Sequence, residues 1–148
     1  MRAHAFPRSR RLKRRRLIRP LFDRARPDVG RVRVGTVAIL YRVVSREAVG
    51  AETPLQVGFS PGRRSPNARR GALRRRLRET FRRHSAALAE RFDRRPTGGP
   101  ARHTLTLFVL YRGPTDGAGE RIERDLPRAL ARLGRELDGA QPDAARPA

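Results

Sequence analysis

The sequence has no cysteine, and Lys13 is its only lysine. Without cysteine the chain can form neither a disulfide bond nor a thiolate metal site. No apolar run approaches the roughly 18 residues that a membrane span requires, and the first twenty residues lack the apolar stretch of a signal peptide. These absences predict a protein of a reducing compartment, the cytoplasm, with no membrane partner.

Groups that could catalyse a reaction are also scarce. The three histidines, His4, His84 and His103, have no metal-ligand spacing to one another. The carboxylates between residues 120 and 125 are typical of a helix start, where the helix dipole favours negative charge. No Gly-x-Gly-x-x-Gly or Walker phosphate loop occurs. The sequence therefore predicts that the chain alone has no catalytic residue, binds no metal or other cofactor and takes no small-molecule substrate.

Positive charge, by contrast, is in large excess. The 148 residues include 36 Lys and Arg against 14 Asp and Glu, which gives a net charge of +22 at pH 7. Such a body needs a polyanion to relieve its self-repulsion, and the candidates are nucleic acid, an anionic membrane and an acidic protein. Arginine suits phosphates and bases, although a GC-rich genome also favours its codons. Codon bias does not explain the excess of bases over acids.

Turn residues and apolar periodicity predict a single domain over residues 10–137, between a flexible basic tail at 1–9 and a disordered tail at 138–148. Periodicity predicts helices over 10–22, 68–92 and 120–137, with Pro20 shortening or kinking the first. Runs rich in β-branched residues predict strands over 32–34, 37–44, 55–60 and 104–112. The order α-β-β-β-α-β-α predicts an α+β fold with a four-stranded sheet packed by helices.

The most basic segment is RRGALRRRLRETFRRH, residues 69–84, in which Glu79 is the single acid. On a helix it would have an apolar seam of Leu73, Leu77 and Phe81. Arginines would border that seam on both sides: Arg70, Arg74 and Arg78 on one flank, and Arg75 and Arg82 on the other. Each helical ion pair contributes only a few tenths of a kcal/mol, so Glu79 offsets little of the repulsion. The pattern favours nucleic-acid contact over a solvated basic face.

The segment VGFSPGRRSPNARRGALRRRLRETFRR, residues 57–83, resembles the central part of the protein component of bacterial ribonuclease P. That family has a strand ending in Val-Gly-Phe-Ser, then two basic residues, then a basic helix reading Arg-Asn-x-x-Lys-Arg-x-x-Arg-Glu. The N-terminal LKRRRLIRPLF resembles the family's first helix, and the later strand and helix follow in the expected order over most of residues 10–137. The sequence departs from the family at Gly71, where asparagine is usual, and at Arg74, where lysine is usual.

The resemblance implies a ribosomal protein S5 domain 2-like fold with a left-handed β-α-β crossover, an exception to the right-handed rule. It implies a subunit of an endoribonuclease whose catalyst is ribonuclease P RNA, which removes the 5′ leader of precursor tRNA by Mg²⁺-dependent hydrolysis. The residues implied to bind the RNA subunit are Arg63, Arg64, Arg70, Arg74, Arg75 and Arg78. Those implied to line a cleft for the single-stranded leader are Ile18, Phe22, Tyr41 and Asn67.

Two other functions remain open at this point. A basic α+β domain also suits an RNA-binding protein with no link to catalysis, such as a ribosomal protein. A double-stranded DNA binder would need Asn, Gln or Ser among the arginines of its recognition helix to read bases, and residues 69–83 contain none. The scattered aromatic residues suit core packing or stacking under unpaired bases.

Overall fold

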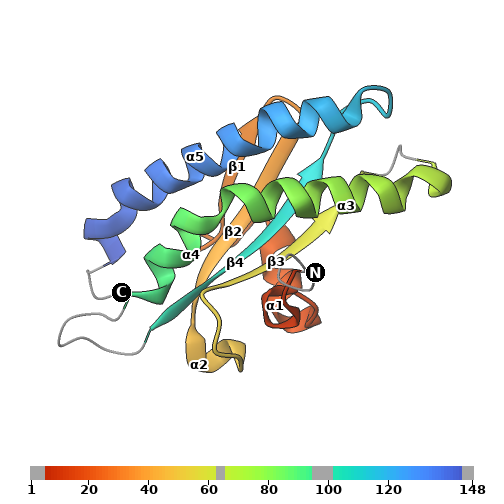
Figure 1. The fold of residues 1–148 in the computed structure, drawn as a ribbon. Coiled ribbons are helices and arrows are strands. Elements are labelled where there is room, and N and C mark those ends of the chain that lie inside the picture. The colour runs from red at the N-terminus through yellow and green to blue at the C-terminus, as the bar shows by residue number, and fades with distance from the viewer. Residues whose placement is uncertain (1–5, 63–65, 95–101, 145–148) are drawn as a thin grey trace.

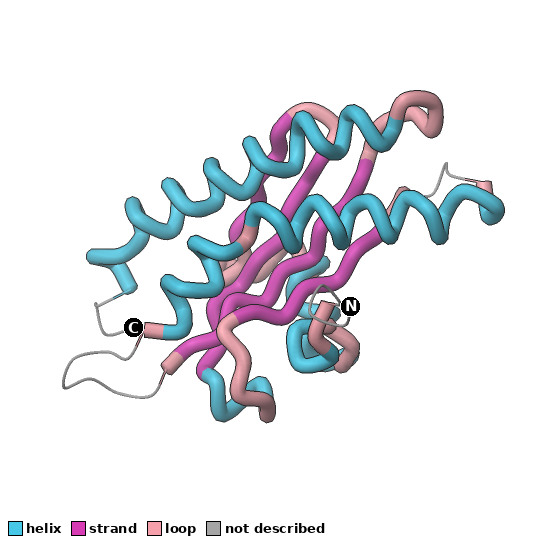
Figure 2. The backbone as a smooth tube through the Cα atoms, in the orientation of Figure 1, coloured by secondary structure: helices cyan, strands magenta, loops and turns pink. Residues whose placement is uncertain are grey.

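A four-stranded mixed sheet runs through the centre of the chain (Figures 1 and 2). The computed structural model describes residues 6–62, 66–94 and 102–144. The strands lie in the order β1-β2-β4-β3, with bounds Gly30–Val34, Val37–Ser45, His103–Tyr111 and Leu55–Ser60 respectively. β2 pairs antiparallel with β1 and β4, whereas β3 pairs parallel with β4. The small α+β domain with a four-stranded sheet is thus confirmed.

The strands lie within one or two residues of their predicted positions. β2 and β4 are long and rich in β-branched and apolar residues, which suits strands at the centre of a sheet. Successive side chains of a strand point to opposite faces. Ile39 therefore packs in one apolar cluster, whereas its neighbour Leu40 packs in the other. The sheet consequently has two cores, one on each face.

Three helices cover the first face: α3 (Asn67–His84), α4 (Ala86–Asp93) and α5 (Ala118–Ala144). They lie in front of the sheet in Figure 1, where α3 and α5 run side by side and β4 lies to the left of β3. The predicted single helix over 68–92 is wrong at one point, because the chain bends at the buried Ser85 between α3 and α4. No glycine or proline marks that bend in the sequence.

The second face carries the short helix α1 (Arg15–Ile18), which continues as the 3₁₀ turn η3 (Arg19–Phe22). Leu17 and Leu21 are buried against Leu40 and Val44 of β2. Pro20 lies in the first turn of η3, where its missing N–H is tolerated, so the change from α to 3₁₀ geometry occurs where proline was expected to disturb the helix. A further short helix, α2 (Arg46–Val49), was not predicted.

Both predicted tails are partly ordered. Phe6 is buried against the rings of Phe59 and Phe81, and residues 8–10 form a 3₁₀ turn, so residues 6–9 belong to the folded body. At the other end, α5 continues to Ala144, so the prediction of disorder over 138–144 is wrong. None of the helices in the described ranges has the length and apolar character needed to cross a membrane.

Candidate nucleic-acid interface

α3 divides into the apolar seam and two basic flanks. Leu73, Leu77 and Phe81 are buried against the sheet, which confirms the predicted seam. The helix forms because four-residue spacing places these side chains in one row, and burying them offsets the repulsion among the arginines. The sequence spacing then requires that the remaining arginines lie to either side of this buried row.

The flank of α3 that faces α5 is neutralised. Glu123 of α5 forms ion pairs with Arg76 and Arg83, the latter at 3.7 Å. Gly119 of α5 allows the close approach, because a Cβ atom there would lie 3.0 Å from the Arg76 guanidinium. These arginines therefore connect two helices and are not free to bind a phosphate without giving up a partner.

The opposite flank carries the row Arg70, Arg74 and Arg78, whose side chains are half-buried, with Arg75 exposed beside it. Arg70 donates a hydrogen bond to the carbonyl of Gly62 at 2.6 Å. Within the described ranges, no carboxylate lies within ion-pair distance of any of these four arginines. We call these four residues the α3 row.

Arg11 extends the α3 row, and its position was not anticipated from the sequence. Residues 10–12 run alongside the outer edge of β3, where Arg11 bridges to Val57 and the Leu12 N–H donates to the Val57 carbonyl. Burial lowers the pKa of the Arg78 guanidinium from its ordinary value, and neighbouring positive charges lower it further. Those neighbours are Arg11, Arg74 and Arg75. The only sequence signal for Arg11 was its place in a basic run.

The positive charges of this cluster repel one another across a partly desolvated surface. A phosphate that accepted hydrogen bonds from several of them would remove that repulsion. Guanidinium groups bind phosphate oxygens through paired N–H donors, which makes the α3 row suited to a sugar–phosphate backbone. Arg63 and Arg64, also predicted to bind RNA, lie outside the described residues.

An apolar shelf lies on the other face of the sheet. The Phe22 side chain is 48% exposed, and its ring packs edge-on against that of Phe108, with centroids 5.1 Å apart. Gly58 of β3 makes room for the Phe108 ring, because a Cβ atom at Gly58 would lie 2.6 Å from it. Ile18 packs in the same cluster. The structure thus brings together Ile18 and Phe22, two of the four residues predicted for the leader cleft.

Tyr41 does not join that shelf. It packs on the opposite face of the sheet, where its hydroxyl donates a hydrogen bond to Oε1 of Glu136 on α5 at 2.9 Å. Burial, followed by this hydrogen bond, raises the pKa of Tyr41 to about 12. The placement of Tyr41 in the cleft is therefore wrong, because strand alternation turns its side chain away from the face that holds Phe22.

Asn67 also lies apart from the shelf. It is the exposed first residue of α3, which packs on the face of the sheet opposite to α1 and η3. Phe108, in contrast, was grouped only with the scattered aromatic residues, although it forms the floor of the shelf. Its tertiary contact with Phe22 joins residues 86 positions apart, and no local pattern encodes that contact.

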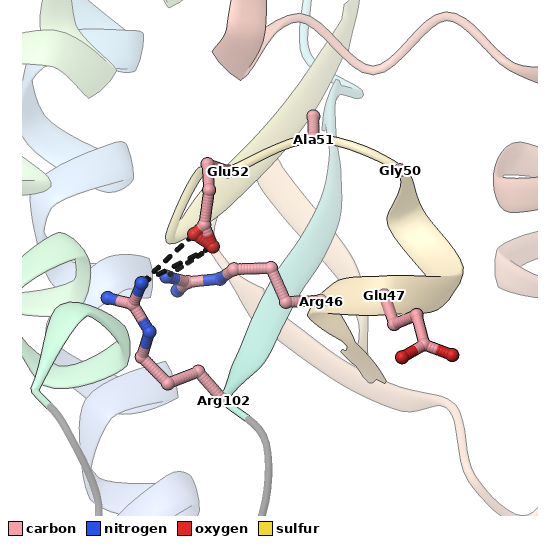
Figure 3. A pocket seen from close by; sticks show the side chains of 6 residues that line it. All are labelled: Arg46, Glu47, Gly50, Ala51, Glu52 and Arg102. Carbon is pink, nitrogen blue, oxygen red and sulfur yellow. Dashed lines mark hydrogen bonds and ion pairs between the residues drawn. The ribbon is translucent and has the colours of Figure 1, made fainter.

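A pocket of about 450 Å³ lies at the end of the sheet near α2, between Arg46, Glu52 and Arg102 (Figure 3). Arg46 is buried and donates to the carbonyls of Phe92 and His103 at 2.6 and 3.0 Å. Glu52 pairs with Arg46 at 3.8 Å and with Arg102 at 2.9 Å. The pocket's cations therefore have protein partners already, and their contacts join α2, α4 and β4.

The described ranges hold no group of three or more His, Cys, Asp or Glu residues that could bind a metal ion. What the arrangement offers chemically is binding: arginines without acidic partners on one side, and an exposed ring over a second ring on the other. Comparison of the chain with protein-family models, with curated proteins and with solved structures finds no match.

Proposed function

We propose that this chain is the protein subunit of a ribonuclease P, binding the catalytic RNA and the 5′ leader of precursor tRNA. The observation that carries the proposal is the geometry of α3. Its seam is buried, and the arginines at the motif positions Arg70, Arg74 and Arg78 lie on a flank with no ion-paired carboxylate in the described ranges. The single acid of α3, Glu79, forms its ion pair with Arg82 and not with an arginine of that flank.

The topology around α3 supports the same proposal. β3 and β4 are parallel neighbours joined through α3 and α4, and in Figure 1 this connection passes in front of the sheet while the chain moves leftward from β3 to β4. Both strands point toward the upper right in that view. With strands in that direction and the connection in front of the sheet, a right-handed crossover would move to the right, and most β-α-β crossovers are right-handed. The arrangement agrees with the left-handed crossover and the ribosomal protein S5 domain 2-like fold that the resemblance implies.

In this proposal the α3 row and Arg11 bind phosphates of the RNA subunit. Ile18, Phe22 and Phe108 provide an apolar surface on which unpaired bases of the leader stack. The RNA subunit performs the Mg²⁺-dependent hydrolysis, and the protein raises the local affinity for substrate without taking part in bond cleavage. Such processing of precursor tRNA would place the protein in the cytoplasm.

Affinity in this arrangement depends strongly on salt. Each phosphate contact releases condensed counterions, so the logarithm of the binding constant falls with the logarithm of salt concentration by about 0.7 to 0.9 per contact. The five arginines of the α3 row and Arg11 would therefore give a slope of about −4 if each binds one phosphate. Lower salt would strengthen assembly by the same relation.

The direct test is reconstitution with a bacterial ribonuclease P RNA and a precursor tRNA at low Mg²⁺. We expect the protein to raise the cleavage rate above that of the RNA alone, and to show no cleavage without RNA. The double variant R74A/R78A should lose most of the stimulation. The matched control R76A/R83A removes the same number of charges from the flank that faces Glu123, and should retain more of it.

Two outcomes would overturn the proposal. Cleavage no faster than with RNA alone would leave a general RNA-binding role, such as that of a ribosomal protein, as the better description. Equal losses in R74A/R78A and R76A/R83A would show that net charge, and not the α3 row, governs the effect.

A further inference from the structure

α5 carries a second array of arginines, away from α3. The five residues recur every three or four positions: Arg121, Arg124, Arg128, Arg132 and Arg135. At 3.6 residues per turn they fall within about 80° of the helix circumference and extend over about 21 Å of its length. We call them the α5 stripe. Arg128, Arg132 and Arg135 are exposed, whereas Ile122, Leu126, Leu130 and Leu133 are buried in the core on the sheet.

The acidic residues of α5 largely avoid this stripe. Glu123 pairs with Arg76 and Arg83 of α3, and Asp138 pairs with Arg91 of α4. Those carboxylates face the contacts of α5 with α3 and α4, and they neutralise the arginines there. These two carboxylates therefore leave the positive charge on the side of α5 that is turned away from α3 untouched.

Two acids lie at the border of the α5 stripe and neutralise part of it. Asp125 pairs with Arg124 at 2.8 Å, and Glu136 with Arg132 at 3.8 Å. In the part of the chain that the structure describes, no carboxylate lies within ion-pair distance of Arg121, Arg128 or Arg135. The Nε of Arg121 is buried there without a hydrogen-bond partner. A bound anion would supply a partner for Arg128 and Arg135, whose side chains are exposed.

The α5 stripe borders β1, the edge strand of the sheet. The Arg132 guanidinium donates to the backbone carbonyl of Arg33 at 3.5 Å, and the exposed side chains of Arg31 and Arg33 lie on that strand. β1 and β3 are the two outer strands of the sheet, and the α3 row with Arg11 lies at the β3 side. In Figure 1, α5 and β1 lie at one edge of the domain and α3 and β3 at the other. The two basic surfaces thus lie at opposite edges, with the ion pairs of Arg76 and Arg91 between them.

We propose that the α5 stripe is a further RNA-binding surface, beyond the α3 row and the apolar shelf, so that one chain holds two RNA duplexes at once, one at each edge of the sheet. A row of arginines that extends over about 21 Å of helix matches an extended series of phosphates better than a single small anion. An RNA duplex holds such a series of phosphates in a fixed geometry. Proteins recognise duplex RNA mainly through its shape and backbone and not through its base sequence. This inference rests on the RNA binding that the proposed function assigns to the α3 row, because a bridge between two RNA segments needs both surfaces.

An anionic membrane fits the α5 stripe less well. Helices that lie in a membrane surface insert leucine or aromatic side chains beside their basic residues. On α5 those positions are occupied by Ile122, Leu126 and Leu133, which are fully buried in the core. The stripe itself offers charge without an apolar side chain to insert, so RNA is the partner that its chemistry favours.

The test measures bridging of two RNA duplexes by the full chain. Two unrelated duplexes of about 20 base pairs, longer than the roughly 16 that a double-stranded RNA-binding domain covers, carry a donor and an acceptor fluorophore respectively. At 150 mM salt and less protein than RNA, we expect energy transfer between duplexes and a sedimenting complex of one chain with two duplexes. A wild-type chain that binds one duplex and never two would overturn the proposal.

Variants assign the bridging to the α5 stripe. R128A/R135A should bind one duplex within about threefold of wild type and lose at least tenfold in bridging, whereas R128K/R135K, which keeps the charge, should retain it. The control R76A/R83A removes two charges from the contact between α3 and α5 and should bridge two duplexes as wild type does. Equal bridging by R128A/R135A and wild type would overturn the proposal, as would an equal loss in R76A/R83A. Binding to phosphatidylserine vesicles through Arg128 and Arg135, with no effect of R128A/R135A on RNA, would assign the stripe to a membrane instead.

Discussion

Asp125 of α5 holds Thr36 in the turn between β1 and β2. Its Oδ2 accepts hydrogen bonds from the Thr36 backbone N–H at 2.8 Å and from the Thr36 hydroxyl at 2.7 Å. Arg124 adds donors at 2.8 and 3.1 Å. Gly35 fits the turn because it has a φ of 56° and because a Cβ atom there would lie 2.5 Å from the carboxylate. A single buried carboxylate therefore connects the long helix to the edge of the sheet.

We predict that Asp125→Ala lowers the free energy of unfolding by about 3 kcal/mol. The substitution leaves the partly buried backbone N–H of Thr36 unpaired and removes charge-assisted hydrogen bonds that contribute about 1.5 to 3 kcal/mol each. Asp125→Asn should cost less, because its amide oxygen still accepts from Thr36. Urea unfolding at pH 7 measures both. Equal stability of Asp125→Ala and wild type would contradict the role assigned to this carboxylate.

The same carboxylate predicts a pH dependence. The Arg124 guanidinium, and after it Thr36, hold the pKa of Asp125 well below its usual range despite burial. A pKa that is lower in the folded state gives stability that is complete above the unfolded-state value, about 3.9, and is lost as pH falls through the folded-state value. The stability difference between wild type and Asp125→Asn should therefore be full at pH 7 and shrink below about pH 4. A difference that stays constant down to pH 2 would contradict this assignment.

We predict that Phe6→Ala destabilises the fold by about 3 kcal/mol, which is the usual cost of removing a buried phenyl ring. Its ring contacts those of Phe59 and Phe81 at centroid distances of 6.0 and 6.3 Å, so the substitution leaves a cavity beneath α3. Thermal unfolding of the full chain measures the effect. Arg8→Ala, an exposed change in the same segment, should have little effect. If the two variants unfold alike, residues 6–9 do not contribute to the core.

We predict that Gly71→Ala stabilises the chain by about 0.5 to 1 kcal/mol. Glycine in the interior of a helix is less favourable than alanine by that amount. At Gly71 an added Cβ meets only the Arg75 guanidinium, at an ordinary 3.8 Å. Gly35→Ala is the contrasting variant and should destabilise, because of its positive φ and its contact with Asp125. A loss of stability in Gly71→Ala would mean that the start of α3 has a constraint other than packing.

We predict that Phe22→Ala weakens binding of single-stranded RNA by about 5- to 150-fold, because stacking of one base on an aromatic ring contributes about 1 to 3 kcal/mol. Its effect on folding should stay near 1 kcal/mol, since the ring is half exposed and loses mainly its contact with Phe108. Fluorescence anisotropy with a labelled leader-length oligonucleotide measures affinity, with Phe22→Tyr as the control that keeps an aromatic ring. Unchanged affinity in Phe22→Ala would remove the shelf from the proposed leader site.

Part of this structure follows from local patterns. The strands were predictable because β-branched and apolar runs bounded by turns have few other favourable conformations. The seam of α3 was predictable because four-residue spacing alone puts Leu73, Leu77 and Phe81 in one row. The bend at Ser85 was not, because nothing in its neighbourhood breaks a helix. The order of residues 138–144 was also missed, since their composition is typical of disorder and the helix continues from a well-packed body.

For the candidate site, too, some features follow from the sequence and others only from the tertiary structure. The sequence by itself determined an excess of positive charge, an amphipathic basic helix and the resemblance that first suggested the proposed function, because these depend on residue type and spacing. Only the tertiary structure decided which arginines keep their charge unpaired: Glu123 neutralises one flank of α3, and Arg11 comes from a distant segment to extend the other. It also turned Tyr41 away from Phe22 and placed Phe108 beneath it. Such pairings depend on strand register and helix packing, which join residues far apart in the chain and leave no local pattern to read.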